Sequence, residues 1–299
     1  MRFPLLRFPL ELALEILRLA ACSQDHQQHI YKTACSLALV SHAIRQIVMP
    51  HLLHTVILST QADVRLFIRT VKQQKHFANI GSSLSLNYSH YIRRLWSTQC
   101  WEPVLYSAHH TNYSILYPIF AGTESMGFNF TSLHLLYEVL GGLYSHSLPG
   151  WQCQRVTFAG TSPMWNPITS TTAGLSFLRQ LTHLTLWIPN NDGDGPASDP
   201  NPYLIPDWVQ KVPLELMPNL IYFAFSLVHN PGSSVVTILA YTLPTAASQD
   251  QNASIFRSWA ISAEPLSYGV TTNVSLTGML GASTHAWEMA YLRGNGPGY

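Results

Sequence analysis

Residues 181–186 read LTHLTL, a pattern in which leucine stands at the first, fourth and sixth positions. Weaker copies are CQRVTF at residues 153–158 and LIYFAF at 220–225, and an earlier copy begins with IRRL at 92–95. The alternation that ends each copy is typical of a strand whose apolar side chains point to one face. Residues 173–180 precede the clearest copy and predict a helix.

The copies begin at residues 153, 181 and 220, so they are spaced by 28 and then 39 residues. A leucine-rich repeat of about 20–29 residues alternates a strand with a return segment, and neighbouring repeats share one core. The pattern therefore resembles an irregular leucine-rich-repeat array with insertions. We expect one insertion as a loop at residues 189–202, further strands over 235–243 and 273–276, and short helices over 137–143 and 284–292. The rest of 101–150 has no assigned structure.

The N-terminal segment LELALEILRLA, which follows Phe8 and Pro9, predicts a helix with proline in its first turn. Its charged residues form one narrow stripe, and its apolar residues lie on both sides of that stripe. Leu10, Leu14 and Leu17 lie on one side, and Leu12, Ile16 and Leu19 on the other. A surface helix normally buries one apolar face, so this helix needs a second partner, either the rest of this chain or another protein.

The next segments continue the helical pattern. Residues 33–50 predict a second helix that ends at Pro50. Residues 51–58 predict a helical turn that passes into a strand. Residues 60–74 predict a third helix, with Thr60 as its N-cap.

Residues 9–58 contain PLEL at 9–12, IL at 16–17, LALVS at 37–41, Arg45, Pro50-x-Leu52 and HTVIL at 54–58. In this order they resemble the F-box, and the strand after it, of fungal (basidiomycete-type) F-box-like proteins. In that family the box binds the Skp-type linker of an SCF (cullin–RING) ubiquitin ligase, and the remaining chain selects the substrate. The resemblance implies linker contacts from Pro9, Leu10, Leu12, Ile16, Leu39, Val40 and Arg45.

We therefore expect an α/β protein with an F-box-like helical unit at residues 1–58. An irregular leucine-rich-repeat-like α/β solenoid at 59–299 is expected to bind a protein substrate. The expected function is that of a substrate-recognition adaptor of an SCF-type ligase, with the linker and cullin complex as partners. No catalysis and no cofactor are expected. Trp187, Asn190 and Asn191 are the predicted recognition edge of the body.

Two other functions remain open. Phe8 and Ile44 stand where the family usually has Leu and Trp, which favours an interaction module whose F-box-like cap does not bind the linker. The other hypothesis is that the protein is an enzyme whose site is assembled from residues far apart in the sequence. It would require a histidine and a carboxylate joined in one polar pocket.

Composition argues against several classes of partner. The net charge is +1, from 16 basic and 15 acidic side chains without a basic run, so nucleic acid is not expected as a ligand. No apolar stretch is long enough to predict a membrane span, and charges interrupt the apolar N-terminus, unlike a signal peptide. Four scattered cysteines suit reduced thiols in the cytoplasm or nucleus. The spacing of Cys22, His26, His29 and Cys35 matches no standard zinc module, so no metal is expected.

Overall fold

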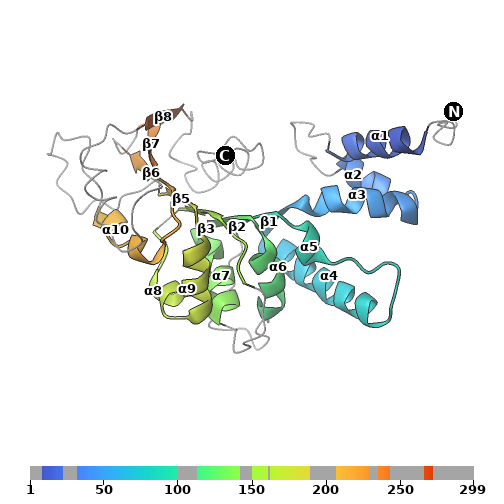
Figure 1. The fold of residues 1–299 in the computed structure, drawn as a ribbon, viewed down its shortest axis with the longest axis horizontal. Coiled ribbons are helices and arrows are strands. Elements are labelled where there is room, and N and C mark those ends of the chain that lie inside the picture. Colours follow the sequence, from blue (N-terminus) through green and yellow to red (C-terminus); the bar gives the residue numbers. More distant parts are fainter. Residues whose placement is uncertain are drawn as a thin grey trace.

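The computed structural model describes residues 9–22, 32–99, 113–141, 150–160, 162–188, 207–228, 235–242 and 266–271. Within these ranges the chain is an α/β protein built on one eight-stranded sheet, with a small group of helices before the first strand (Figure 1). The expected α/β class is therefore confirmed. The strand expected at 273–276, the helix at 284–292 and the loop at 189–202 lie outside the described residues.

Three helices form the N-terminal unit, which we define as α1 (Leu10–Cys22), α2 (Lys32–Ala38) and α3 (His42–His54). The expectation of one helix ending at Pro50 is wrong. Ser41 caps a new helix, because its hydroxyl accepts a hydrogen bond from the Ile44 amide. Pro50 lies inside α3, which continues to His54 because the buried side chains of Met49 and Leu53 anchor its last turns.

The sheet adds its strands in the order of the sequence. Its first six strands pair in parallel, and β7 and β8 pair antiparallel at one edge. The strands are β1 (Thr55–Thr60), β2 (Arg94–Gln99), β3 (Ser125–Asn129), β4 (Arg155–Ala159), β5 (His183–Trp187), β6 (Tyr222–Val228), β7 (Val235–Thr242) and β8 (Leu266–Thr271). The strands expected at the four pattern copies and at 235–243 are confirmed. The expected boundary between residues 58 and 59 falls inside β1, so this strand joins the N-terminal unit to the sheet.

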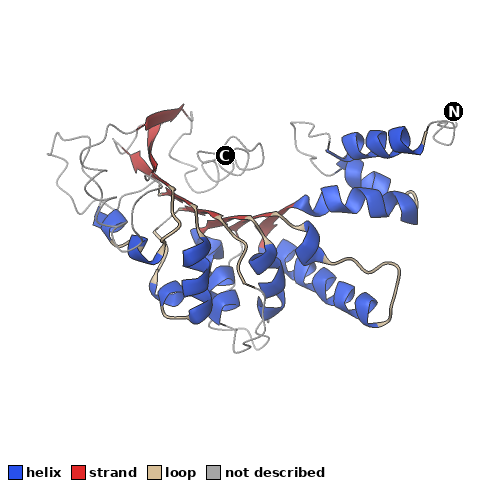
Figure 2. Cartoon of the chain, in the orientation of Figure 1, coloured by secondary structure: helices blue, strands red, loops and turns tan. Residues whose placement is uncertain are grey.

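The helices that connect the parallel strands lie on one side of the sheet (Figures 1 and 2). They are α4 (Gln61–Asn79), α5 (Tyr88–Tyr91), α6 (Tyr117–Gly122), α7 (Leu133–Gly141), α8 (Asn166–Thr169) and α9 (Thr172–Gln180). Before β6 come α10 (Asp207–Gln210) and the 3-10 turn η4 (Leu214–Leu216); the turns η2 (Tyr113–Leu116) and η3 (Phe130–Ser132) flank α6 and α7. The helices expected over 60–74, 137–143 and 173–180 are confirmed as α4, α7 and α9.

The main core lies between this helix layer and the sheet. Alternate strand residues supply it: Leu95, Met126, Phe128, Val156, Phe158, Leu184, Leu186, Phe223 and Phe225. The strand residues between them point to the opposite side, which we call the far face. There Trp96, Ala159, Trp187 and Ala224 form a second, smaller apolar cluster. The period-two pattern of each copy thus divides its side chains between the two faces.

Candidate functional site

The apolar residues on two sides of α1 have different environments. Ala13, Leu17 and Ala21 are buried at four-residue spacing, on the side that faces the rest of the N-terminal unit. Leu12, Ile16 and Leu19 are exposed, and Leu12 retains 53% of its accessible surface. The expectation that α1 has more apolar surface than its own unit buries is therefore confirmed for this helix.

A polar stripe borders the exposed apolar side. Arg18 Nε donates a hydrogen bond to Glu15 Oε2 over 2.8 Å, and both side chains are about half-exposed. This hydrogen bond lowers the pKa of Glu15 below its usual value, so the pair is charged at neutral pH. The exposed surface of α1 therefore has an apolar side next to a pair of charged side chains.

The turn between α2 and α3 adds a second exposed apolar pair. Leu39 and Val40 expose 85% and 64% of their surface. An apolar residue in such a turn gains nothing from exposure to water, so these two side chains are available to a partner. We use the name hook surface for Leu12, Ile16, Leu19, Leu39 and Val40.

The remaining residues implied by the F-box resemblance have different settings. Pro9 is exposed, and its carbonyl accepts the first helical hydrogen bond from Ala13. Arg45 is half-buried on α3. Leu10 belongs to α1, but its side chain lies outside the described part. Ile44 is partly buried against the apolar cluster of Ala21, Ala34 and Val48 inside the unit.

The prediction that Trp187 lies on an exposed recognition edge is wrong. Trp187 ends β5 on the far face and is only 3% exposed, packed in the cluster with Trp96, Ala159 and Ala224. Ala159 is its register partner in β4, and this small side chain leaves space beside it for the indole. Burial of a large apolar ring is favourable, so the residue acts in packing. Asn190 and Asn191 lie outside the described residues.

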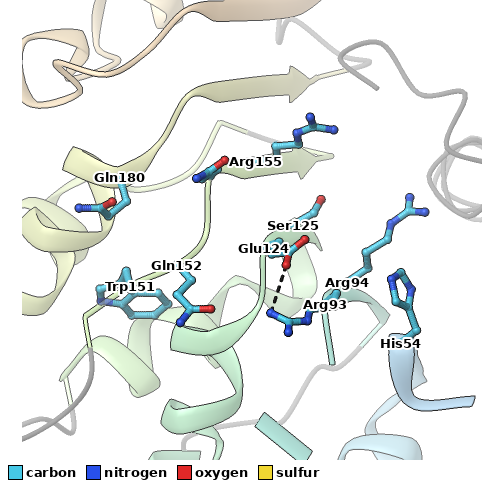
Figure 3. Close-up of a pocket in the computed structure, with 10 residues that line it drawn as sticks. His54, Arg93, Arg94, Glu124, Ser125, Trp151, Gln152, Arg155 and Gln180 are labelled. Carbon is cyan, nitrogen blue, oxygen red and sulfur yellow. Dashed lines mark ion pairs between the residues drawn. The ribbon is translucent and has the colours of Figure 1, made fainter. Parts of the chain in front are cut away.

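A polar hollow of about 580 Å³ lies where the parallel strands begin (Figure 3). We call it the strand-start pocket. Its ionisable lining consists of His54, Arg93, Arg94, Glu124 and Arg155. These side chains come from the residues just before β1 and at the starts of β2, β3 and β4. The parallel register therefore places them together at the end of the sheet where the strands begin.

Neutral groups complete the lining of this pocket. Gln152, Gln154 and Gln180 supply amides, Ser125 supplies a hydroxyl, and Trp151 supplies an indole. Trp151 is buried, and its ring meets Phe177 of the main core edge-on at 5.0 Å between centroids. The pocket therefore has a rigid apolar wall and a polar lining.

A ladder of main-chain hydrogen bonds fixes the floor of the strand-start pocket. The carbonyl of the residue before each strand accepts from the chain that starts the next one. The donors and acceptors are Arg93 N to His54 O at 3.0 Å, Glu124 N to Arg93 O at 2.9 Å, Gln154 N to Glu124 O at 3.0 Å, and Thr182 N to Gln154 O at 2.8 Å. These main-chain hydrogen bonds fix the backbone where the strands begin. They therefore also fix the points from which the lining side chains extend.

The described lining of the pocket has a positive formal charge. Arg93 Nη1 lies 3.1 Å from Glu124 Oε1, and Glu124 is the one carboxylate among the described lining residues. The pKa of His54 is lowered first by the partial loss of water around its ring and then by Arg94. His183 is the first residue of β5, the strand next to β4. Burial lowers the pKa of His183 first, and the charge of Arg155 lowers it further. Both imidazoles are therefore neutral at pH 7.

Sequence reasoning missed this pocket, although a signal was present. The third position of each copy of the strand pattern holds Arg94, Arg155, His183 or Tyr222. That position is the first residue of its strand and points to the far face. Arginine, histidine and tyrosine side chains thus recur at one position of the repeat. In a parallel sheet such residues lie side by side, so this recurrence predicts a site where the strands begin.

No protein-family model matches this chain, and no curated protein or solved structure matches it either. Across the described residues, no helix is both long and apolar enough to cross a bilayer. The same part of the chain holds no cluster of three or more His, Cys, Asp or Glu side chains suited to a metal ion.

Proposed function

We propose that the protein is a substrate-recognition adaptor of an SCF-type ubiquitin ligase. In this proposal the N-terminal unit is F-box-like and binds a Skp-type linker, and the sheet with its helix layer is a leucine-rich-repeat-like body that binds a protein substrate. The observation that carries the proposal is the hook surface, five exposed apolar side chains on a unit of three short helices.

The exposed flank of α1 has the form that a groove-binding helix needs. Leu12, Ile16 and Leu19 follow one another at spacings of four and three residues, which places them in one row on the helix. An amphipathic helix binds a partner by laying such a row into an apolar groove. These three side chains are already about half-buried, so burying the rest of each contributes about 1 kcal/mol, roughly half of the value for a fully exposed side chain.

The body supports the second half of the proposal. Its strands and helices repeat in sequence order, which is the arrangement of proteins whose repeats bury a continuous core. An adaptor carries out no bond-making step. It raises the local concentration of a substrate lysine beside the charged conjugating enzyme by holding both in one complex. Co-purification of the chain with a fungal Skp-type linker tests the proposal, and a stoichiometric complex is expected.

A second function is a protein-interaction module that does not bind the linker. Ile44 favours it, because the residue at the family's usual tryptophan position packs partly inward against Ala21, Ala34 and Val48. A linker interface would then lack one large side chain. In this case the chain stays folded and forms no complex with the linker.

The enzyme reading required a histidine and a carboxylate in one polar pocket, and the strand-start pocket contains His54 and Glu124. The charge of Glu124 acts to raise the pKa of His54, but the polar contacts described for the two groups are with other residues. Glu124 pairs with Arg93, and His54 Nδ1 lies 3.2 Å from Thr55 Oγ1. The pocket is therefore better suited to binding than to proton transfer between these two groups.

A further inference from the structure

Arg94, Ser125 and Arg155 begin three neighbouring parallel strands and are register partners across them. They share one face of the sheet, because each is the first residue of its strand. Neighbouring strands lie about 4.8 Å apart, which places the two arginine α-carbons about 10 Å apart with the serine between them. An arginine side chain is long enough to cover half of that span. Figure 3 shows all three side chains extending on the same side of the strands.

Three arginines and one carboxylate are among the described lining residues of the pocket, so this lining has a positive formal charge. The guanidinium of Arg93 is paired with Glu124, so these two charges offset each other. Arg94 and Arg155 are both half-buried, where Coulombic interactions are less screened than at a fully exposed site. Their guanidinium groups are always charged and present planar pairs of N–H donors.

We propose that the strand-start pocket binds an oxyanion, a phosphate or a carboxylate, carried by the protein that the body recognises. Arg94 and Arg155 donate to the oxyanion from two sides, and Ser125 lies between them. Guanidinium groups bind such oxygens through paired, charge-assisted hydrogen bonds. The inference rests on the proposed function only in that the body binds a protein, and it is independent of linker binding.

A protein ligand fits the charges better than a nucleic acid does. A nucleic acid presents phosphates at regular intervals and is bound by an extended basic surface. Here the net charge of the chain is +1, and the described lining of the pocket holds three arginines, not an extended basic surface. A single oxyanion on a peptide matches a site of this size.

The test uses the full chain and three immobilised pools of degenerate peptides, whose central residue is a phosphorylated Ser, Thr or Tyr, a Glu, or a Ser. We expect retention on the phosphorylated pool, the glutamate pool, or both, and the comparison identifies the source of the oxyanion. Retention is expected to fall about tenfold or more in the Arg94→Gln, Arg155→Gln double variant. The matched control is Arg65→Gln, Arg69→Gln, which removes the same charge from the exposed side of α4 and leaves retention unchanged.

Free inorganic phosphate provides a second measurement on the unaltered chain, so the test does not depend on the folding of a variant. Phosphate is expected to displace the bound peptides more strongly than chloride at equal ionic strength. Equal retention on all three pools, or equal displacement by both salts, overturns the proposal. Displacement by single-stranded RNA at lower concentration than by phosphopeptide overturns the choice of a protein ligand. Neither result affects linker co-purification, which is measured separately.

Discussion

The indole of Trp96 in β2 lies across the α-carbon of Gly127, its register partner in β3. A β-carbon on residue 127 would overlap the six-membered ring of Trp96, at atoms Cε3 and Cζ3. Trp96 is fully buried on the far face, so its ring has no free space into which to move. The glycine therefore makes room for a tryptophan on the adjacent strand.

Replacement of Gly127 by alanine is expected to destabilise the sheet by overpacking, at a cost of about 1–3 kcal/mol in the free energy of unfolding. Urea denaturation followed by far-UV circular dichroism measures this loss. Gly141→Ala is the matched control, because nothing lies within 4 Å of a β-carbon at that position. In a Trp96→Ala background the Gly127→Ala cost is expected to shrink. An unchanged midpoint for Gly127→Ala in the original chain would contradict the packing of β2 against β3.

The N-terminus of α4 is held by a capping box. Thr60 Oγ1 accepts a hydrogen bond from the Asp63 amide over 3.2 Å, and Asp63 Oδ2 accepts one from the Thr60 amide over 2.9 Å. Thr60→Ala is expected to cost about 1 kcal/mol of folding stability, measured by the same denaturation. Thr70→Ala removes the same atoms from the middle of α4, where its hydroxyl bonds only to the Leu66 carbonyl, and is expected to cost less. A larger loss at Thr70 than at Thr60 would argue against this cap.

The stability of the fold is expected to fall in mild acid because of His183. Burial and Arg155 lower the pKa of this imidazole below its ordinary value of about 6.5. The unfolded chain therefore binds the proton first, and stability that is full above pH 6.5 is lost as pH falls through the lower folded-state pKa. His54 contributes in the same direction.

Unfolding midpoints between pH 5 and 8 measure this dependence. His183→Gln is expected to flatten the decline below pH 6.5, whereas His76→Gln, on the exposed side of α4, leaves it unchanged. A steeper decline in His183→Gln than in the original chain would show that the sign of this linkage is wrong.

Much of the fold could be predicted because its signals are local. The period-two copies at Leu181 and Leu220 predict strands, and the alternation also predicts which side chains enter the core. Thr60 is recognisable as a cap because capping is a contact between residues three apart. The exposed flank of α1 could be predicted from its helical periodicity.

The errors arise where distant residues decide the structure. Pro50 remains inside α3 because Leu53 is buried, and no sequence window shows that burial. Trp187 is buried because small residues on neighbouring strands, Ala159 and Ala224, leave it space. The strand-start pocket joins Arg94 to Arg155, 61 positions later by their numbers, and only the parallel register brings them to one edge.

The adaptor proposal depends on the exposed flank of α1 more than on any other feature. Its most direct test is co-purification of residues 1–299 with a fungal Skp-type linker, using the Leu12→Asp, Ile16→Asp double variant beside the original chain. Both positions are exposed, so the free energy of unfolding of the variant is expected to stay within about 0.5 kcal/mol of the original value for each substitution. Leu66→Asp is the matched control, since Leu66 on α4 is 58% exposed and lies outside the hook surface.

We expect a stoichiometric complex for the original chain and for Leu66→Asp. In the Leu12→Asp, Ile16→Asp variant we expect the complex to be lost while the circular dichroism spectrum stays unchanged. A folded original chain that elutes apart from the linker, or a double variant that binds it as well as the original does, would contradict the adaptor function.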